Sequence, residues 1–110
     1  MSAITTHVLD TASGRPAAGV TVRLERRDGP VWLLLAQAET DADGRCRDLG
    51  PATTEAGEHR LTFATGPWFA ERGTPAYHPE ISVTFEVTGD GHHHVPLLVA
   101  PFGFTTYRGS

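Results

Sequence analysis

Two residue types are missing from this sequence of 110 residues, and cysteine occurs only once. All nine basic residues are arginines, so no lysine can form a Schiff base, bind phosphate in a P-loop or complete a Ser–Lys dyad. Asparagine is also absent, which excludes N-glycosylation sequons. The single cysteine, Cys46, allows neither an intrachain disulfide nor a CxxC zinc site.

Long apolar runs are missing as well. No stretch approaches the roughly 20 residues that span a bilayer, and no basic segment followed by an apolar run marks a signal peptide, so we expect a cytoplasmic location. The net charge of -4 and the pI near 5.8 argue against binding to nucleic acid or to anionic membranes. With 39% hydrophobic and 20% charged residues, the chain is expected to fold as one domain, residues 1–110.

What is abundant is the residue pattern of strands. Threonine and valine are frequent, and turn residues recur at short intervals. Apolar and polar residues alternate in 20–26 and 81–88, which is typical of half-buried strands, whereas the apolar run 31–38 predicts a more buried one. The expected strands span residues 2–9, 20–26, 31–38, 58–65, 81–88, 92–100 and 104–107.

One short helix is expected at residues 67–72, because proline suits a first helical turn and Gly73 suits the end. The sequence Asp28-Gly29 predicts a tight hairpin between two strands. Seven or eight short strands with one short helix predict a β-sandwich, and its unpaired edge strands favour edge-to-edge oligomerisation.

The most distinctive polar feature is the triplet His92, His93 and His94, which opens a strand after a turn. Side chains alternate across a strand, so His92 and His94 share one face and His93 takes the other. A histidine pair of this kind can bind a metal or transfer protons near neutral pH, and it can equally be a solvated strand end. The residues alone leave these alternatives open.

The other histidines and Arg45 are less informative by themselves. His7 lies within the first expected strand, opposite the apolar face, and His59 and His78 have no neighbours that indicate chemistry. Arg45 follows a polar turn, where an arginine is commonly solvated. Its guanidinium could also bind an anionic or carbonyl-rich substrate.

The last four residues combine a phenol, a guanidinium, a glycine and a hydroxyl directly after an expected strand. Chain ends commonly fray, but this segment could be held in a groove. Cys46 lies between Arg45 and Arg47, whose charges could lower the pKa of its thiol, although a lone cysteine in a turn is usually inert. The motifs GxSxG, HExxH and GxGxxG are all absent.

Several spaced motifs carry a resemblance that covers nearly the whole chain. They are Thr6-His7-Val8-Leu9-Asp10 with 14–17, the turn 40–45, the segment 77–81, and residues 92–110. Together they resemble the transthyretin-like family, specifically its 5-hydroxyisourate hydrolases. The sequence Tyr-Arg-Gly-Ser at 107–110 is the feature that separates these hydrolases from the hormone carrier transthyretin, which has the same fold.

The resemblance implies an all-β, transthyretin-like sandwich of two four-stranded sheets with one short helix. It also implies a homotetramer, a dimer of dimers whose active sites lie at the subunit interface, and no cofactor or metal. A supporting role falls to His92. The implied catalytic residues are His7, Arg45, His94 and Ser110. The implied substrate-binding residues are His7, Arg45, Tyr107, Arg108, Gly109 and Ser110.

The reaction implied is the opening of a cyclic amide bond in 5-hydroxyisourate, which gives 2-oxo-4-hydroxy-4-carboxy-5-ureidoimidazoline in urate degradation. Such a step needs a base for water, a donor for the oxyanion and an acid for the departing nitrogen. The chain departs from the family at His93, Phe102 and Phe104, where relatives often carry tyrosine. These changes remove hydroxyls but leave the matched polar residues in place.

Three other functions fit parts of the pattern. A transthyretin-type carrier of a small ligand would use the same central channel, but it would have no need for the terminal tetrapeptide. A zinc-dependent hydrolase could take His7, His92 and His94 as ligands, because catalytic zinc commonly has three protein ligands. A plain interaction domain would leave the polar groups from distant segments unexplained.

Overall fold

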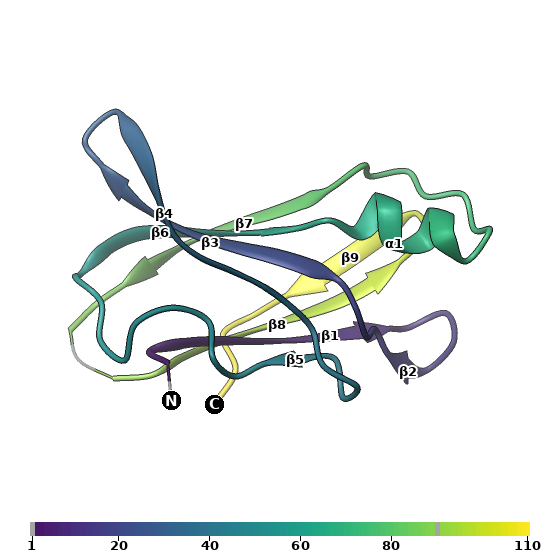
Figure 1. Ribbon diagram of the computed structural model, residues 1–110, viewed down its shortest axis with the longest axis horizontal. Coiled ribbons are helices and arrows are strands. Elements are labelled where there is room, and N and C mark those ends of the chain that lie inside the picture. Colours follow the sequence, from purple (N-terminus) through teal and green to yellow (C-terminus); the bar gives the residue numbers. More distant parts are fainter. Residues whose placement is uncertain (1, 90) are drawn as a thin grey trace.

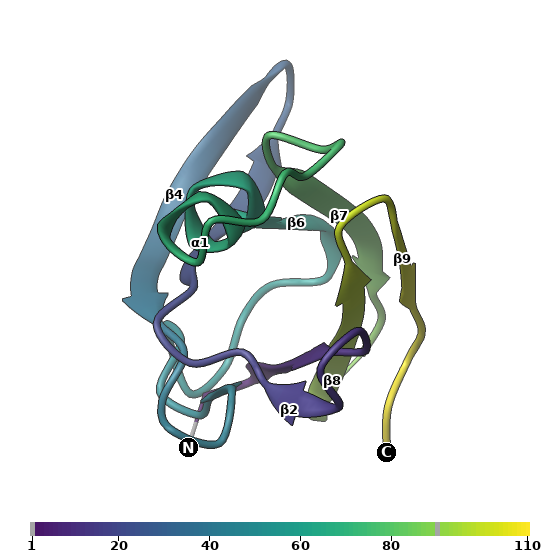
Figure 2. The same ribbon diagram turned by 90° about the vertical axis from the view of Figure 1, so that its right-hand side faces the viewer.

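Two β-sheets face each other in the computed structural model, which describes residues 2–89 and 91–110 (Figures 1 and 2). The first sheet contains, in order, β2 (Arg15–Pro16), β1 (Ile4–Asp10), β8 (His93–Ala100) and β9 (Gly103–Thr106), with β5 (Arg45–Cys46) also paired to β1. The second contains, in order, β4 (Val31–Glu39), β3 (Thr21–Asp28), β6 (Gly57–Phe63) and β7 (Ile81–Val87). The predicted β-sandwich is confirmed, and the first sheet gains a short fifth strand.

The alternating strands bury one face each, as the sequence predicts. In β1 the side chains of Ile4 and Val8 are at most 1% exposed, whereas His7 between them is half-buried and points to the opposite face. In β7 the buried and exposed residues alternate in the same way. The core between the sheets is formed by fully buried aliphatic and aromatic side chains, among them Val22, Leu24, Leu61, Phe63, Leu97 and Val99.

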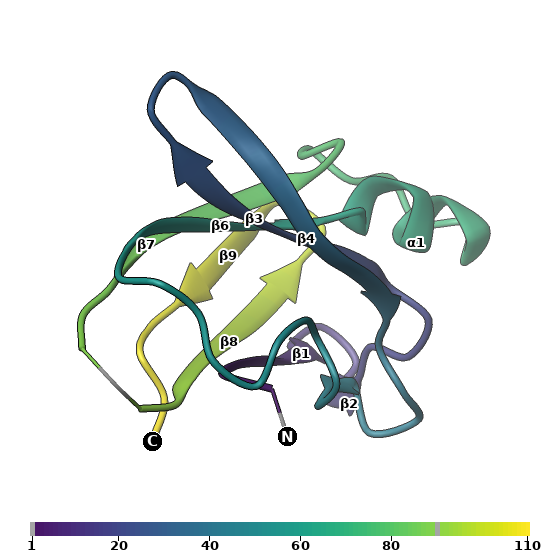
Figure 3. The ribbon, with the colours of Figure 1, turned by 60° about the vertical axis from the view of Figure 1, so that its left-hand side comes forward.

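The expectation of a more buried strand at residues 31–38 is wrong. β4 is an edge strand, and most of its residues are exposed or half-exposed. The β3–β4 hairpin projects beyond the rest of its sheet (Figure 3), so Val31 and Leu34 remain more than half exposed. Trp32 lies on this hairpin with the Arg60 guanidinium 4.3 Å from the centre of its ring. The apolar run at residues 31–38 therefore predicted the strand correctly, but it did not predict that the strand would be largely exposed.

The helix α1 spans Thr65–Glu71 and begins two residues before the predicted start. Pro67 occupies the first turn, where no intrahelical hydrogen bond is lost, and Gly73 follows the end with a φ of 68°. Trp68 is buried and its indole Nε1 donates a hydrogen bond of 2.7 Å to the Ala18 carbonyl. The helix therefore covers one end of the sandwich.

Two histidines lie inside the core. His59 is fully buried and its hydrogen bonds are satisfied, because Nδ1 donates to the Gly57 carbonyl (3.1 Å) and Nε2 accepts from the Thr54 hydroxyl (2.8 Å). His93 is 3% exposed, and its Nε2 has no hydrogen-bond partner. Burial lowers the pKa of both imidazoles, and the Arg108 charge lowers that of His93 further. Both rings are therefore neutral in the folded protein at neutral pH.

These buried rings predict a loss of stability in mild acid. The unfolded chain binds protons at the ordinary histidine pKa of about 6.5, whereas the folded chain resists protonation, so the free energy of unfolding falls as pH drops below that value. Urea unfolding at pH 5.5 and 7.5, at one protein concentration, measures the difference. The variant His93→Phe should show a weaker pH dependence than the wild type. The control His78→Gln removes a half-buried histidine outside the core. An equal pH dependence in His93→Phe and in this control would contradict the assignment to His93.

Candidate active site

The candidate site lies on the outer face of the first sheet, away from the core. Thr5 of β1 pairs in register with His94 of β8, and His7 pairs with Arg45 of β5, so these four side chains share one face. Thr5, Arg45 and His94 line a pocket of about 180 Å³, whereas His7 lies on the same face outside that lining. The residues that line it are Thr5, Thr6, Arg45, Arg47, His92, His94 and Ser110. The structure thus brings most of the predicted catalytic residues together from both ends of the chain.

His7 is held by a backbone carbonyl. Its Nε2 lies 2.9 Å from the Asp43 oxygen, and because a carbonyl can only accept, Nε2 carries the hydrogen and donates it. When the ring is neutral, Nδ1 therefore bears the free lone pair. The hydrogen bond fixes both the orientation of His7 and the nitrogen that can act as a base.

His92 and His94 form the pair that the alternation of the strand predicts. Their rings stack with centroids 6.3 Å apart, and His93 points into the core. The hydroxyl of Thr5 lies between them, 2.8 Å from His92 Nε2 and 2.8 Å from His94 Nδ1. This leaves His94 Nε2 as the ring nitrogen that is free to interact with a substrate.

The electrostatic surroundings keep His94 neutral. Its pKa is lowered first by burial, and then by the positive charge of Arg45 and by the neighbouring rings of His92 and His7. A neutral imidazole at physiological pH has a lone pair available to accept a proton from water. His94 therefore has the protonation state that a general base requires.

Arg45 is positioned by the turn that precedes it. The Asp41 carboxylate accepts hydrogen bonds of 2.9 Å from the backbone N–H groups of Arg45 and Asp43, and these bonds, the Arg45 one most strongly, hold the pKa of Asp41 below its usual value. Gly44 adopts a φ of 77°, and a Cβ there would overlap the backbone oxygen of Val8. The turn thus needs glycine to bring the Arg45 side chain beside β1.

The predicted tail residues are divided between two places. Gly109 donates a backbone hydrogen bond of 2.7 Å to the His94 carbonyl, which brings Ser110 to the pocket. Tyr107 and Arg108 instead line a separate groove of about 270 Å³ next to His93. Within one chain, Tyr107 and Arg108, which were expected to bind substrate, therefore do not lie in the pocket that contains His94.

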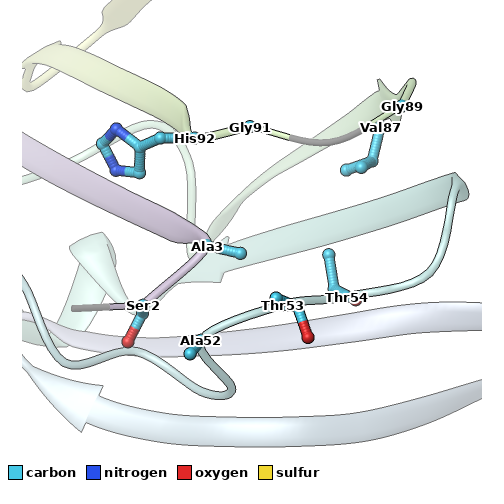
Figure 4. A pocket seen from close by; sticks show the side chains of 9 residues that line it. All are labelled: Ser2, Ala3, Ala52, Thr53, Thr54, Val87, Gly89, Gly91 and His92. Carbon is cyan, nitrogen blue, oxygen red and sulfur yellow. The ribbon is translucent and has the colours of Figure 1, made fainter.

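A second pocket, of about 330 Å³, lies beside the site at the end of the sandwich (Figure 4). Small side chains such as Ser2, Ala3 and Thr53 line it, and His92 stands at its edge. Apart from His92, no charged or titratable side chain lines it within residues 2–89 and 91–110. The groups suited to chemistry are therefore concentrated on the sheet face that carries His94.

Two residues of the site were missed from the sequence. Thr5 was interpreted only as part of a strand, because threonine is common in strands and gives no signal of its own. Arg47 lines the pocket beside Arg45, and its guanidinium is 3.8 Å from the Asp41 carboxylate. The spacing of Arg45 and Arg47 could have indicated it, since residues two apart in an extended segment share a face.

Of the two interpretations of Cys46, the structure supports the inert residue and not a thiol whose pKa is lowered by Arg45 and Arg47. Cys46 is 4% exposed and faces the core, because it pairs with Thr6 on the buried side of β1. Burial, assisted by the negative charge of Asp41, raises the pKa of its thiol to about 11. Cys46 is therefore a structural residue with no thiolate at neutral pH.

A zinc site built from three histidines finds no support in the geometry. Across residues 2–89 and 91–110, no three His, Cys, Asp or Glu side chains are grouped as metal ligands. One ring nitrogen of His92 and one of His94 are each hydrogen-bonded to the Thr5 hydroxyl. No helix in the described part of the chain is long and apolar enough to cross a membrane.

Comparison with known proteins identifies close relatives. A curated 5-hydroxyisourate hydrolase of Caulobacter vibrioides is 50% identical over 115 residues, covering all of both chains. The 5-hydroxyisourate hydrolase of Mus musculus is 44% identical and covers 99% of this chain and 96% of its own.

Solved structures show the same fold in two kinds of protein. The 5-hydroxyisourate hydrolase of Klebsiella pneumoniae superposes with a TM-score of 0.87 at 43% identity, over 97% of this chain and 98% of its own. Transthyretin of Sparus aurata gives a TM-score of 0.89 at 28% identity, over 99% and 97%. The model of the HIUase/Transthyretin family matches residues 4–109. With this match and these full-length identities, the chain belongs to the HIUase/Transthyretin family.

Proposed function

We propose that this protein hydrolyses 5-hydroxyisourate, in the degradation of urate. The single observation that carries the proposal is the convergence of His7, Arg45 and His94 on one sheet face, in a chain 50% identical to a curated 5-hydroxyisourate hydrolase. The fold itself does not separate a hydrolase from a carrier, because transthyretin superposes equally well. The proposal therefore depends on the site and on sequence identity.

The chemistry follows from the protonation states at the site. Water attacks the ring carbonyl; His7, held by the Asp43 carbonyl, orients the water, and the neutral ring of His94 takes its proton. The Arg45 guanidinium stabilises the negative charge that develops on the carbonyl oxygen. The carbon–nitrogen bond then breaks, and the proton returns to the departing nitrogen. The products are a carboxylate and a ureido group on the remaining imidazoline ring, with one water consumed and one proton released as the carboxylic acid ionises.

The tail is the second part of the proposed site. Ser110 lines the pocket and can donate a hydrogen bond to the substrate ring, as Tyr107 would do, with Arg108 ordering the segment. Because Tyr107 lies in the neighbouring groove of the same chain, its participation requires either a shift of the tail or a tail from another subunit. The reaction as proposed uses no metal or other cofactor.

We further propose a homotetramer with the active sites at the subunit interface. The site is a shallow pocket on an open sheet face, whereas acid–base chemistry works best where water is excluded. Exposed aromatic side chains gather near the β8–β9 turn, and exposed apolar patches commonly mark protein interfaces. They are Tyr77, Phe102 and Phe104.

The predicted cytoplasmic location stays a prediction, as does the organisation of residues 1–110 as one domain.

The deciding experiment follows the ultraviolet decay of 5-hydroxyisourate generated freshly by urate oxidase. We expect the protein to accelerate the decay, with the same rate before and after treatment with EDTA, because side chains alone supply the base and the oxyanion donor. The mass of the assembly, from light scattering on the same sample, is expected to be four times that of the chain.

Each outcome has a defined meaning. Loss of activity in EDTA with recovery on adding zinc would favour the metal-dependent reaction. An unchanged rate of 5-hydroxyisourate decay in the presence of a folded tetramer would contradict the hydrolase proposal and favour a small-ligand carrier. The control is the triple variant His7→Ala, Arg45→Ala, His94→Ala at the same protein concentration. Its rate measures the decay of 5-hydroxyisourate that does not depend on the site.

A further inference from the structure

Thr5 occupies an unusual place between two imidazoles. Its side chain is 6% exposed, and its only hydroxyl lies 2.8 Å from His92 Nε2 and 2.8 Å from His94 Nδ1. A hydroxyl has one hydrogen to donate, so it can donate to one ring and must accept from the other. The Thr5 hydroxyl therefore links His92, which directly precedes β8, to His94 within β8.

Only two neutral arrangements satisfy both hydrogen bonds. In the first, Thr5 donates to His94 Nδ1 and accepts from His92 Nε2, so both rings carry hydrogen on Nε2. In the second, Thr5 donates to His92 Nε2 and accepts from His94 Nδ1, so both rings carry hydrogen on Nδ1. The geometry thus links the tautomers: the two neutral rings must have the same one. Only the second arrangement leaves the lone pair of His94 Nε2 free for water.

We propose that Thr5 is a positioning residue that couples His94 to His92 and passes a proton between them during the reaction. This inference rests on the proposed hydrolase function. When His94 Nε2 takes a proton from water, His94 Nδ1 gives its hydrogen to the Thr5 oxygen, and Thr5 gives its own hydrogen to His92 Nε2. The result is a neutral His94 and a positively charged His92. The same steps run backwards when the departing nitrogen is protonated.

The charges around the site favour this transfer. His94 is partly buried, and the cationic Arg45 of β5 and the ring of His7 on β1 oppose a positive charge on it. Arg47 adds a second guanidinium to the same pocket. His92 is exposed, so water can solvate the charge there. Moving one proton by way of Thr5 therefore carries the charge from a disfavoured ring to a solvated one.

The test compares Thr5→Val, which keeps the shape of the side chain, with Thr5→Ser, which keeps the hydroxyl. We expect Thr5→Val to lower kcat by about 10- to 100-fold, with little change in KM, as for partial loss of acid–base assistance. The acidic limb of its pH profile should move to lower pH, because the protonated His94 ring has lost its hydrogen-bond acceptor. Thr5→Ser should restore both properties.

A matched control separates this role from a structural one. Thr62 is also 6% exposed, and its hydroxyl makes a hydrogen bond of 3.2 Å to Ser82 in the other sheet. Thr62→Val should therefore affect stability alone, leaving kcat and the pH profile unchanged. In the double variant Thr5→Val, His92→Gln, the loss of kcat should not exceed that of the larger single loss, because both changes interrupt one pathway.

A second readout does not depend on the reaction. Long-range proton–nitrogen NMR of the wild-type protein labelled with ¹⁵N-histidine reports the tautomer of each ring at a pH where both are neutral. We expect the same tautomer for His92 and His94, and loss of this correspondence in Thr5→Val. Different tautomers in the wild type, or wild-type kcat and pH profile in Thr5→Val, would overturn the inference. Absence of hydrolysis by the wild type would instead overturn the proposed function, while the NMR result would still test the coupling.

Discussion

Replacing His94 by alanine is expected to lower kcat for 5-hydroxyisourate by about 10²- to 10⁴-fold, the usual value of general acid–base assistance. His94 combines a ring nitrogen facing the pocket, a fixed orientation through Thr5 and a neutral charge state. Its side chain is half-buried on the outer sheet face, so its removal leaves the core intact. Initial rates by ultraviolet absorbance, with circular dichroism to confirm the fold, measure the effect.

The pH dependence gives this expectation a second test. Burial and the charge of Arg45 lower the pKa of His94, so the wild type should stay active below pH 6.5 and lose activity only as the pH falls through the lowered value. Removing the charge in Arg45→Gln should move the acidic limb to higher pH. The variant Arg27→Gln, which removes an exposed arginine of β3 in the other sheet, serves as the control. Full activity of His94→Ala would assign the base to His7 alone.

Replacing Gly109 by alanine is expected to lower kcat by about 10²-fold without unfolding the protein. A Cβ on Gly109 would lie 2.7 Å from His94 Cδ2 and 3.2 Å from Pro96 Cγ, so either the tail or the imidazole must move. The backbone hydrogen bond from Gly109 to the His94 carbonyl would lengthen, and Ser110 would leave the pocket. Displacements of about 1 Å at a reacting centre can have effects of this size.

The chain offers a matched control for this variant. Gly103 begins β9, shortly before the same tail, and a Cβ there would meet no atom within 4 Å. Gly103→Ala should therefore retain wild-type kcat, while the steady-state kinetics of Gly109→Ala show the loss. Equal activities for the two variants would mean that close packing of the tail on His94 has no part in catalysis.

The fold could be predicted where the residue pattern reports burial directly. The alternation in β3 and β7 gave both the strands and their buried faces, because each has one face in the core. The apolar run of β4 suggested burial that its edge position does not provide, since periodicity carries no information about which strand lies at an edge. The two-residue strands β2 and β5 were not predicted, because their pairing to β1 depends on tertiary contacts.

The site could be predicted in part for similar reasons. The pairing of His92 with His94 on one face follows from the geometry of a strand, and the structure shows them stacked. Their neighbours could not be derived, because parallel pairing of β1 with β8 joins residues nearly 90 positions apart. The role of Thr5 could not be predicted from the sequence, because the hydrogen bonds of its hydroxyl form only when β8 pairs with β1.

The parallel pairing of β1 with β8 also governs when the protein becomes competent during synthesis. The second sheet consists of hairpins and neighbouring strands between residues 21 and 87, which can associate as they leave the ribosome. β1 is made first but must wait for β8, and contacts between such distant segments form slowly. The catalytic face is thus completed late, and the appearance of activity requires both this pairing and, in the proposed tetramer, the assembly of the subunits.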